Sequence, residues 1–227
     1  MNIAIVGSKG RMGQALLACA RLQPRIDVVG VDIGDSIEIV IGSIDVVLDF
    51  SSPDAIEPLS RICAEERKPL VIGTTGHSED QEAIIQHRAK EIPIVKATNF
   101  STGVNTLFWL TRKAAEILGT GYDLGITEIH HRHKKDAPSG TARTLGTILM
   151  DVLWKRKDLR TVPVHSFRIG DVAGDHTVIF AGNGERLELT HKASSRDTFA
   201  NGALRAAQWI VGKPPGLYDM QDVLGLK

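Results

Sequence analysis

Short apolar runs alternate with helical patterns over the first hundred residues of the chain. The apolar runs each predict a buried strand, and they cover residues 3–6, 28–31, 46–48, 70–72 and 94–95. Helical spacing lies between them at residues 12–22, 53–66 and 78–91, where Pro53 suits a first turn and Ser78 suits an N-cap. Strands of this kind, separated by helices, predict a doubly wound parallel sheet covered on both faces. Ligands of such sheets bind at the carboxyl ends of the strands.

The pattern changes in the second half of the chain. Residues 104–118 and 141–155 predict amphipathic helices, and residues 124–129 predict a strand between them. Three strands then follow without intervening helices, at residues 164–169, 176–181 and 186–191, with a turn at Gly182-Asn-Gly184 between the last two. A helix is expected over residues 197–211, followed by loop and a short helix. This half is typical of an α+β domain with antiparallel strand pairs.

Composition narrows the classes of function. The chain has 27 lysines and arginines against 27 aspartates and glutamates, so it lacks the basic excess of a nucleic-acid-binding protein. Cys19 and Cys63 lie among apolar neighbours, which predicts buried free thiols rather than a disulfide. No apolar run reaches the roughly 18 residues of a membrane span. Met1 is followed directly by a predicted strand, so we expect no signal peptide. We therefore expect a cytoplasmic enzyme that binds neither nucleic acid nor a membrane.

A glycine-rich segment, Gly7-Ser-Lys-Gly-Arg-Met-Gly13, lies between the first strand and the first helix. Gly7 allows a sharp turn, Gly10 lets the backbone approach a pyrophosphate, and Gly13 permits close packing of the helix. The spacing differs from the commoner Gly-x-Gly-x-x-Gly, so the triplet alone also fits a simple tight turn. Asp32 ends the second strand about 20 residues further on, as a dinucleotide-binding unit requires. A carboxylate there accepts hydrogen bonds from ribose hydroxyls and repels a 2′-phosphate, which predicts that NADH works at least as well as NADPH.

Two further loops follow the fourth and fifth strands. They are Gly73-Thr74-Thr75 and Ala97-Thr98-Asn99-Phe100. Both lie where the nicotinamide and its ribose are expected, and their hydroxyl, carbonyl and amide groups can hydrogen-bond a carboxamide. In isolation, neither loop would be assigned a function.

Ionisable and hydroxyl side chains are concentrated in the segment from Glu128 to Ala142, which reads Glu-Ile-His-His-Arg-His-Lys-Lys-Asp-Ala-Pro-Ser-Gly-Thr-Ala. Consecutive histidines on a strand point to opposite faces, and no cysteine or carboxylate pattern completes a metal site, so we expect no metal at His130, His131 and His133. A basic, solvated loop is one interpretation. The other is anion binding with acid–base chemistry, because histidine exchanges protons near neutral pH and lysine supplies a fixed charge.

The end of the same segment favours the second interpretation. Pro138 stiffens the approach to a helix, Gly140 removes side-chain bulk, and Ser139 and Thr141 supply hydroxyls at the helix start. A helix N-terminus binds carboxylates for the same electrostatic reason that it binds phosphates. We therefore expect a small anionic substrate here.

Five motifs occur in order along nearly the whole chain. They are Gly-x-x-Gly-Arg-Met-Gly, Gly-Thr-Thr-Gly, Asn-Phe-Ser, Glu-x-His-His-x-x-Lys-x-Asp-x-Pro-Ser-Gly-Thr-Ala and His-Lys-Ala-Ser-Ser-Arg…Phe-Ala-x-Gly-Ala. With these motifs the chain resembles the 4-hydroxy-tetrahydrodipicolinate reductase (dihydrodipicolinate reductase) family of lysine and diaminopimelate biosynthesis. The long histidine motif is highly specific to that family.

The resemblance implies a role for each matching residue. His130 and Lys134 are the implied catalytic groups, and His131, Ser139, Gly140 and Thr141 are the implied contacts of the substrate carboxylates. Lys135 falls outside the motif, and we expect it to be solvated. The implied binding residues of NADH or NADPH are Gly7, Ser8, Lys9, Gly10, Arg11, Met12, Asp32, Gly73, Thr74, Thr75, Ala97, Thr98, Asn99 and Phe100.

The resemblance also implies an architecture and a reaction. Residues 1–100 and 205–227 would form a Rossmann-type domain, and residues 101–204 an α+β domain with a mixed sheet that binds substrate and assembles a homotetramer. The reaction would reduce 4-hydroxy-tetrahydrodipicolinate, a cyclic imine dicarboxylate, with loss of water. The segment between Asp32 and Asp45 is shorter than the family pattern, which leaves the cofactor preference open.

Two alternatives share the glycine loop. One is an NAD-dependent amino-acid dehydrogenase that oxidises aspartate or a similar acid. The other is a non-enzymatic module that senses a dinucleotide and needs neither His130 nor Lys134.

Overall fold

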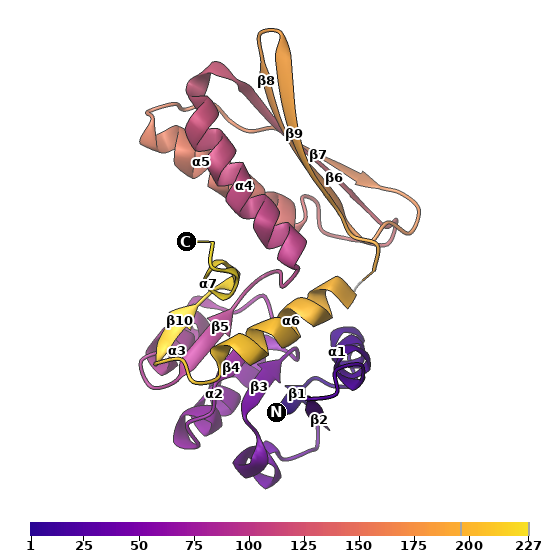
Figure 1. Ribbon diagram of the computed structural model, residues 1–227, viewed down its shortest axis with the longest axis vertical. Helices are drawn as coiled ribbons and strands as arrows, with labels where there is room; N and C mark the ends of the chain where they lie inside the picture. Colours follow the sequence, from indigo (N-terminus) through magenta and orange to yellow (C-terminus); the bar gives the residue numbers. More distant parts are fainter. Residues whose placement is uncertain (196, 227) are drawn as a thin grey trace. The chain divides into compact units, whose positions relative to one another are not determined.

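The computed structural model describes residues 1–195 and 197–226, and these divide into two compact units (Figure 1). The first unit contains residues 1–102 and 197–226, and the second contains Gly103–Ser195. Arg196, part of the last motif, and Lys227 lie outside the described residues. No helix among the described residues has both the length and the apolar character needed to cross a membrane.

The first unit contains a six-stranded sheet in which every strand pair is parallel. Its strands are β1 (Asn2–Val6), β2 (Asp27–Val31), β3 (Val46–Asp49), β4 (Leu70–Ile72), β5 (Pro93–Lys96) and β10 (Gly216–Tyr218), in the spatial order β10-β5-β4-β3-β1-β2. The five apolar runs form the predicted strands. β10 was not predicted, because its three residues contain a glycine and are too few to show a periodicity.

Helices cover both faces of this sheet. They are α1 (Arg11–Arg21), α2 (Ile56–Glu65), α3 (Glu79–Arg88), α6 (Asp197–Ile210) and α7 (Met220–Leu224), with short 3-10 turns at Ile37–Ile39, Ile41–Ser43 and Pro53–Ala55. Successive residues of β1 point into opposite cores: Ile3 and Ile5 pack in the core that contains residues of α1, α6 and α7, and Ala4 packs in the core of α2 and α3. Ser78 caps α3 as predicted, in a reciprocal capping box with Gln81. Cys19 and Cys63 are buried and free, also as predicted.

The order of the strands reverses between β1 and β3, whose carboxyl ends lie at the same edge. Gly7 follows β1 with a positive φ of 81°, and Phe50 follows β3. A Cβ on Gly7 would lie only 2.4 Å from the carbonyl oxygen of Phe50. The backbone therefore excludes any side chain at this reversal point, which is where doubly wound sheets bind their ligands.

The second unit contains a four-stranded mixed sheet. Its strands are β6 (Asp123–His130), β7 (Val164–Arg168), β8 (Asp175–Gly182) and β9 (Glu185–Lys192), in the order β7-β6-β8-β9. The β6–β8 and β8–β9 pairs are antiparallel, and Asn183-Gly184 forms the predicted turn. The β6–β7 pair is parallel, which the strand pattern alone did not predict. The crossover between β6 and β7 contains α5 (Gly140–Lys155), and such a connection is what permits a parallel pair.

Two helices, α4 (Thr102–Leu118) and α5, lie along one face of the mixed sheet, and the 3-10 turn Gly119–Gly121 follows α4 (Figure 1). Alternate residues of β6 point toward these helices, and Ile126 belongs to the apolar core there. Glu128 and His130 follow it on the same face and are also buried. This face of the sheet therefore ends in polar side chains that are nevertheless buried.

Candidate active site

Glu128 is fully buried, and one of its carboxylate oxygens is held by two neighbouring segments. Oε1 accepts a hydrogen bond from Nη2 of Arg168 at 2.7 Å and another from the backbone N–H of Ser139 at 3.1 Å. Burial raises the pKa of Glu128, but hydrogen bonds from Ser139, Ser166 and Arg168 outweigh burial and lower the pKa to about 2. The carboxylate is therefore ionised throughout the physiological range.

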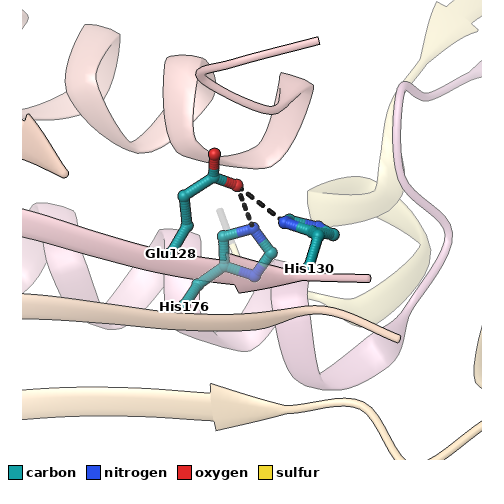
Figure 2. Close-up of side chains that lie close together, drawn as sticks. All are labelled: Glu128, His130 and His176. Carbon is teal, nitrogen blue, oxygen red and sulfur yellow. Dashed lines mark ion pairs between the residues drawn. The ribbon is translucent and has the colours of Figure 1, made fainter. Parts of the chain in front are cut away.

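Two imidazoles face the other carboxylate oxygen, as Figure 2 shows. Nδ1 of His130 lies 2.8 Å from Oε2 of Glu128, and Nε2 of His176 lies 3.8 Å from the same atom. His176 reaches this position because it pairs directly with Glu128 in the β6–β8 ladder. The two rings meet edge to face, with centroids 5.1 Å apart.

Burial keeps both rings neutral near pH 7. The pKa of His130 is lowered mainly by burial, and the charges of Lys134 and Arg168 lower it further, while the charge of Glu128 raises it in part. Burial and the neighbouring His130 lower the pKa of His176 to about 4. Each ring therefore has one nitrogen with a proton and one with a free lone pair.

Glu128, His130 and His176 also have the spacing of a metal site. Their candidate ligand atoms lie within 4.8 Å of one another, and no other such group occurs in the part of the chain that the structure describes. His131 and His133 do not join it. The guanidinium of Arg168 already neutralises the carboxylate at 2.7 Å and would repel a divalent ion. We therefore interpret the cluster as a charge and proton network.

The loop after β6 presents the remaining predicted groups of this unit. Nζ of Lys134 forms an ion pair with Oδ1 of Asp136 at 2.8 Å, and this contact lowers the pKa of Asp136. Ser139 caps α5 by accepting a hydrogen bond from the backbone N–H of Ala142 at 3.2 Å. Its hydroxyl also lies 3.2 Å from Nε2 of His176. The cap of the helix is thus tied directly to the buried cluster.

Some of the predicted residues of this unit contact the Glu128 cluster, and others lie outside it. His130 and Ser139 contact the Glu128 cluster, and Lys134 acts on it through its charge. Gly140 and Thr141 form the first residues of α5. The ring of His131 instead packs near His133, with centroids 6.4 Å apart.

Three members of the cluster were not assigned by the sequence: Glu128, Arg168 and His176. Glu128 was detectable, because it lies two residues before His130 on a predicted strand and must share its face. Arg168 and His176 were not detectable, because their positions depend on the register of β7 and β8 against β6.

In the first unit, the glycine loop has the features of a phosphate site. α1 begins after Gly10, which supplies no side-chain cap, so the amides of the first turn are left for an anion. A Cβ on Gly13 would lie 2.3 Å from the carbonyl oxygen of Gly7, so the helix packs directly on the loop. These residues fit the pyrophosphate of a dinucleotide.

Asp32 lies beside this loop. Its Oδ2 accepts a hydrogen bond from the backbone N–H of Lys9 at 2.7 Å, and its Oδ1 accepts one from the N–H of Ile33 at 2.9 Å. These hydrogen bonds lower the pKa of Asp32. An ionised carboxylate next to the loop fits a ribose whose hydroxyls donate to it.

Phe50 contacts the other predicted cofactor segments, although no sequence motif pointed to it. A Cβ on Gly73 would lie 2.2 Å from its ring, and the ring centroid lies 5.6 Å from that of Phe100. Its carbonyl oxygen contacts Gly7 as described above. The carboxyl ends of β1, β3, β4 and β5 lie along one edge of the parallel sheet, and Gly73–Thr75 and residues 97–100 follow two of these strands.

Comparison with known proteins gives one consistent result. Residues 1–100 match the family model described as dihydrodipicolinate reductase, N-terminus, and residues 103–224 match dihydrodipicolinate reductase, C-terminus. The chain is 50% identical to the 4-hydroxy-tetrahydrodipicolinate reductase of Akkermansia muciniphila, over all of this chain and 98% of that protein. It is 42% identical to the enzyme of the same name from Halorhodospira halophila, over all of this chain and 99% of that protein.

A solved structure shares the fold. The structure of dipicolinate-bound dihydrodipicolinate reductase from Paenisporosarcina sp. TG-14 matches with a TM-score of 0.83 and 24% identity, over 98% of each chain. The Halorhodospira alignment spans 265 positions, against the 227 residues of this chain. Relatives therefore contain residues that have no counterpart here.

Proposed function

The chain belongs to the dihydrodipicolinate reductase family, and we propose that it reduces 4-hydroxy-tetrahydrodipicolinate to tetrahydrodipicolinate with loss of water. The proposal places this reaction in the cytoplasm, in the biosynthesis of lysine and diaminopimelate. NADH or NADPH is the proposed reductant, with NADH at least as effective.

One observation supports the proposal above the others. The buried imidazole of His130 ends β6, and the ammonium of Lys134 and the capped start of α5 follow it in the next ten residues. A doubly negative ring needs positive charge and helix-end amides for its carboxylates, and a reduction that ends with protonation needs an exchangeable proton. Neither alternative function requires this combination.

The proposed roles divide between the two units. When bound, a reduced nicotinamide supplies the hydride for C4 of the substrate. The first-turn amides after Gly10 and the carboxylate of Asp32 would hold the dinucleotide at its pyrophosphate and ribose. The loops Gly73–Thr75 and Ala97–Phe100 would orient the nicotinamide end.

In the second unit, the proposed roles concern charge and protons. Lys134 would exchange its ion pair with Asp136 for a substrate carboxylate. His131, Ser139, Gly140 and Thr141 would contact the carboxylates, and the start of α5 would supply partial positive charge. His130 would exchange a proton through Nε2, because its Nδ1 is fully buried.

The proposed assembly is a homotetramer through the mixed sheet. α4 and α5 cover one face of that sheet, and the opposite face carries Ile129, Phe167 and Ile179 on three adjacent strands. Phe167 is 50% exposed in the single chain. Association through such a face would bury these side chains.

The test is a turnover assay with purified protein and enzymatically generated 4-hydroxy-tetrahydrodipicolinate. Consumption of NADH or NADPH that depends on this substrate is expected, and pyridine-2,6-dicarboxylate should inhibit it competitively, since dipicolinate is bound in the related Paenisporosarcina protein. Oxidation of aspartate with NAD, without reduction of the dicarboxylate, would support the dehydrogenase instead. Cofactor binding without either turnover would support the sensing module.

A further inference from the structure

We propose that Glu128 is a positioning residue that keeps one proton of His130 on Nδ1, so that Nε2 is the nitrogen that takes up the second proton and delivers it to a bound substrate. The inference rests on the proposed role of His130 as the proton-exchanging group, and it assigns a function to a residue outside the contacts proposed for substrate and cofactor.

Two buried atoms of the cluster face each other. Oε2 of Glu128 and Nδ1 of His130 are both inaccessible to solvent, and neither makes a well-aligned hydrogen bond to any described residue. They lie 2.8 Å from each other. A lone pair on Nδ1 would face an ionised carboxylate there, whereas an N–H would be attracted to it. The proton therefore belongs on Nδ1.

Glu128 is itself held in place by neighbouring segments. Its other oxygen, Oε1, is fixed by Arg168 on β7 and by the backbone of Ser139 at the start of α5. The side chain is fully buried on β6, two residues from His130 on the same face. A carboxylate held from two sides can determine the orientation of a ring whose Nδ1 lies 2.8 Å from it.

The space around Nε2 of His130 is kept open by a glycine. Gly174, the residue before β8, packs against this edge of the ring, and a Cβ there would lie 3.0 Å from Nε2. Glycine is the residue that leaves the nitrogen least obstructed. Nδ1 faces the interior, so Nε2 is the nitrogen that can meet a ligand.

The charged groups around His130 come from every neighbouring segment. They are Glu128 on β6, Lys134 and Asp136 in the following loop, Arg168 on β7 and His176 on β8, with His191 of β9 acting on His176. Lys134 and Arg168 oppose a second proton on His130, and the carboxylate of Glu128 is the strongest charge that favours it. Without Glu128, the imidazolium form would lose its main electrostatic support.

The first test uses the wild-type protein and needs no turnover. ¹⁵N-histidine NMR above the pKa of His130 distinguishes the two neutral tautomers, with His130→Gln used to assign the signal. The Nδ1–H tautomer is expected, and a predominant Nε2–H tautomer would overturn the inference. If the protein has the Nδ1–H tautomer but does not turn over the dicarboxylate, the proposed function is wrong. The inferred position of the His130 proton would still hold.

The second test compares Glu128→Gln with Glu116→Gln, a change of an exposed glutamate on α4 in the same unit. Glu128→Gln removes the charge that favours protonated His130, so its kcat/KM should begin to fall with rising pH at a lower pH than in the wild type. At pH 8, its activity should be about tenfold or more below that of the wild type. Its KM for NADH should change less than about twofold. Glu128→Asp should restore part of the wild-type profile, and Glu116→Gln should reproduce it. An unshifted profile in folded Glu128→Gln would refute the inference, and if that variant does not fold, the tautomer measurement decides.

Discussion

Lys134 has its charge balanced by Asp136 before any substrate binds. A substrate carboxylate would replace Asp136 and take up a charge-assisted hydrogen bond, which is among the stronger contacts available to an anion. Lys134→Ala should therefore lower kcat/KM for the dicarboxylate by about 100-fold or more, since both substrate binding and charge stabilisation are lost. Steady-state kinetics with varied substrate would measure this loss.

Lys135 supplies the matched control. It is the next residue, carries the same charge and is exposed. Lys135→Ala should retain kcat/KM within about twofold, as is usual for exposed positions without partners. Near-normal turnover in Lys134→Ala, or an equal loss in both variants, would contradict the role proposed for Lys134.

Asp32 should determine which dinucleotide is preferred. Its ionised carboxylate lies beside the glycine loop, where it can accept from ribose hydroxyls but would repel a 2′-phosphate. Asp32→Ala should therefore raise the ratio of kcat/KM for NADPH to that for NADH by about tenfold or more, because hydrogen bonds to charged groups contribute about 1.5–3 kcal/mol.

Asp27→Ala is the control for this change, because Asp27 is exposed at the opposite end of β2. It should leave the ratio unchanged. A strong preference of the wild type for NADPH would show that Lys9 or Arg11 outweighs the carboxylate.

At the scale of elements, the burial of ionisable groups between β6 and β8 should make the protein sensitive to acid. The pKa of His176 falls from its usual 6.5 to about 4, so the folded state binds fewer protons than the unfolded state between these values. Stability should therefore decrease as the pH falls through this window, by about 2 kcal/mol from this residue between pH 7 and pH 5. Glu128, with its pKa lowered to about 2, loses its contribution only below about pH 4.5.

Chemical denaturation at pH 7 and pH 5 measures this dependence. His176→Gln should reduce the difference between the two pH values by about 2 kcal/mol, whatever its effect on stability at pH 7. His165→Gln, a change of an exposed histidine on β7, should retain the wild-type difference. An equal pH dependence in all three proteins would show that His176 is not responsible.

Elements with a strong local signal were predicted from the sequence. The five apolar strands, the Ser78 cap and the Asn183-Gly184 turn depend on residues next to one another in the chain. The mixed sheet was implied by the resemblance, but β10 and the identity of the parallel β6–β7 pair were not predicted from the strand pattern, since both depend on which distant strand lies alongside. The same limit applies to the site: His130 and Ser139 came from one continuous motif, whereas Arg168 and His176 reach Glu128 only through strand register.

The face of the mixed sheet that α4 and α5 do not cover is the proposed interface of the homotetramer. Phe167 is half exposed, on the face opposite α4 and α5, with Ile129 and Ile179 on the adjacent strands. A homotetramer formed through this face would bury Phe167, and Phe167→Glu would then place a charge in an apolar interface. Sedimentation velocity should show a tetramer for the wild type and smaller species for this variant.

Ile117 provides the comparison for that experiment, because it is 81% exposed on α4, which packs on the other face. Ile117→Glu should remain tetrameric, since a charge at an exposed helical position is solvated in either state. Dissociation of both variants would indicate an interface that is not confined to the sheet. If the wild type is monomeric at micromolar concentration, the exposed apolar residues of the sheet are not covered by other copies of the chain, and the proposed homotetramer is wrong.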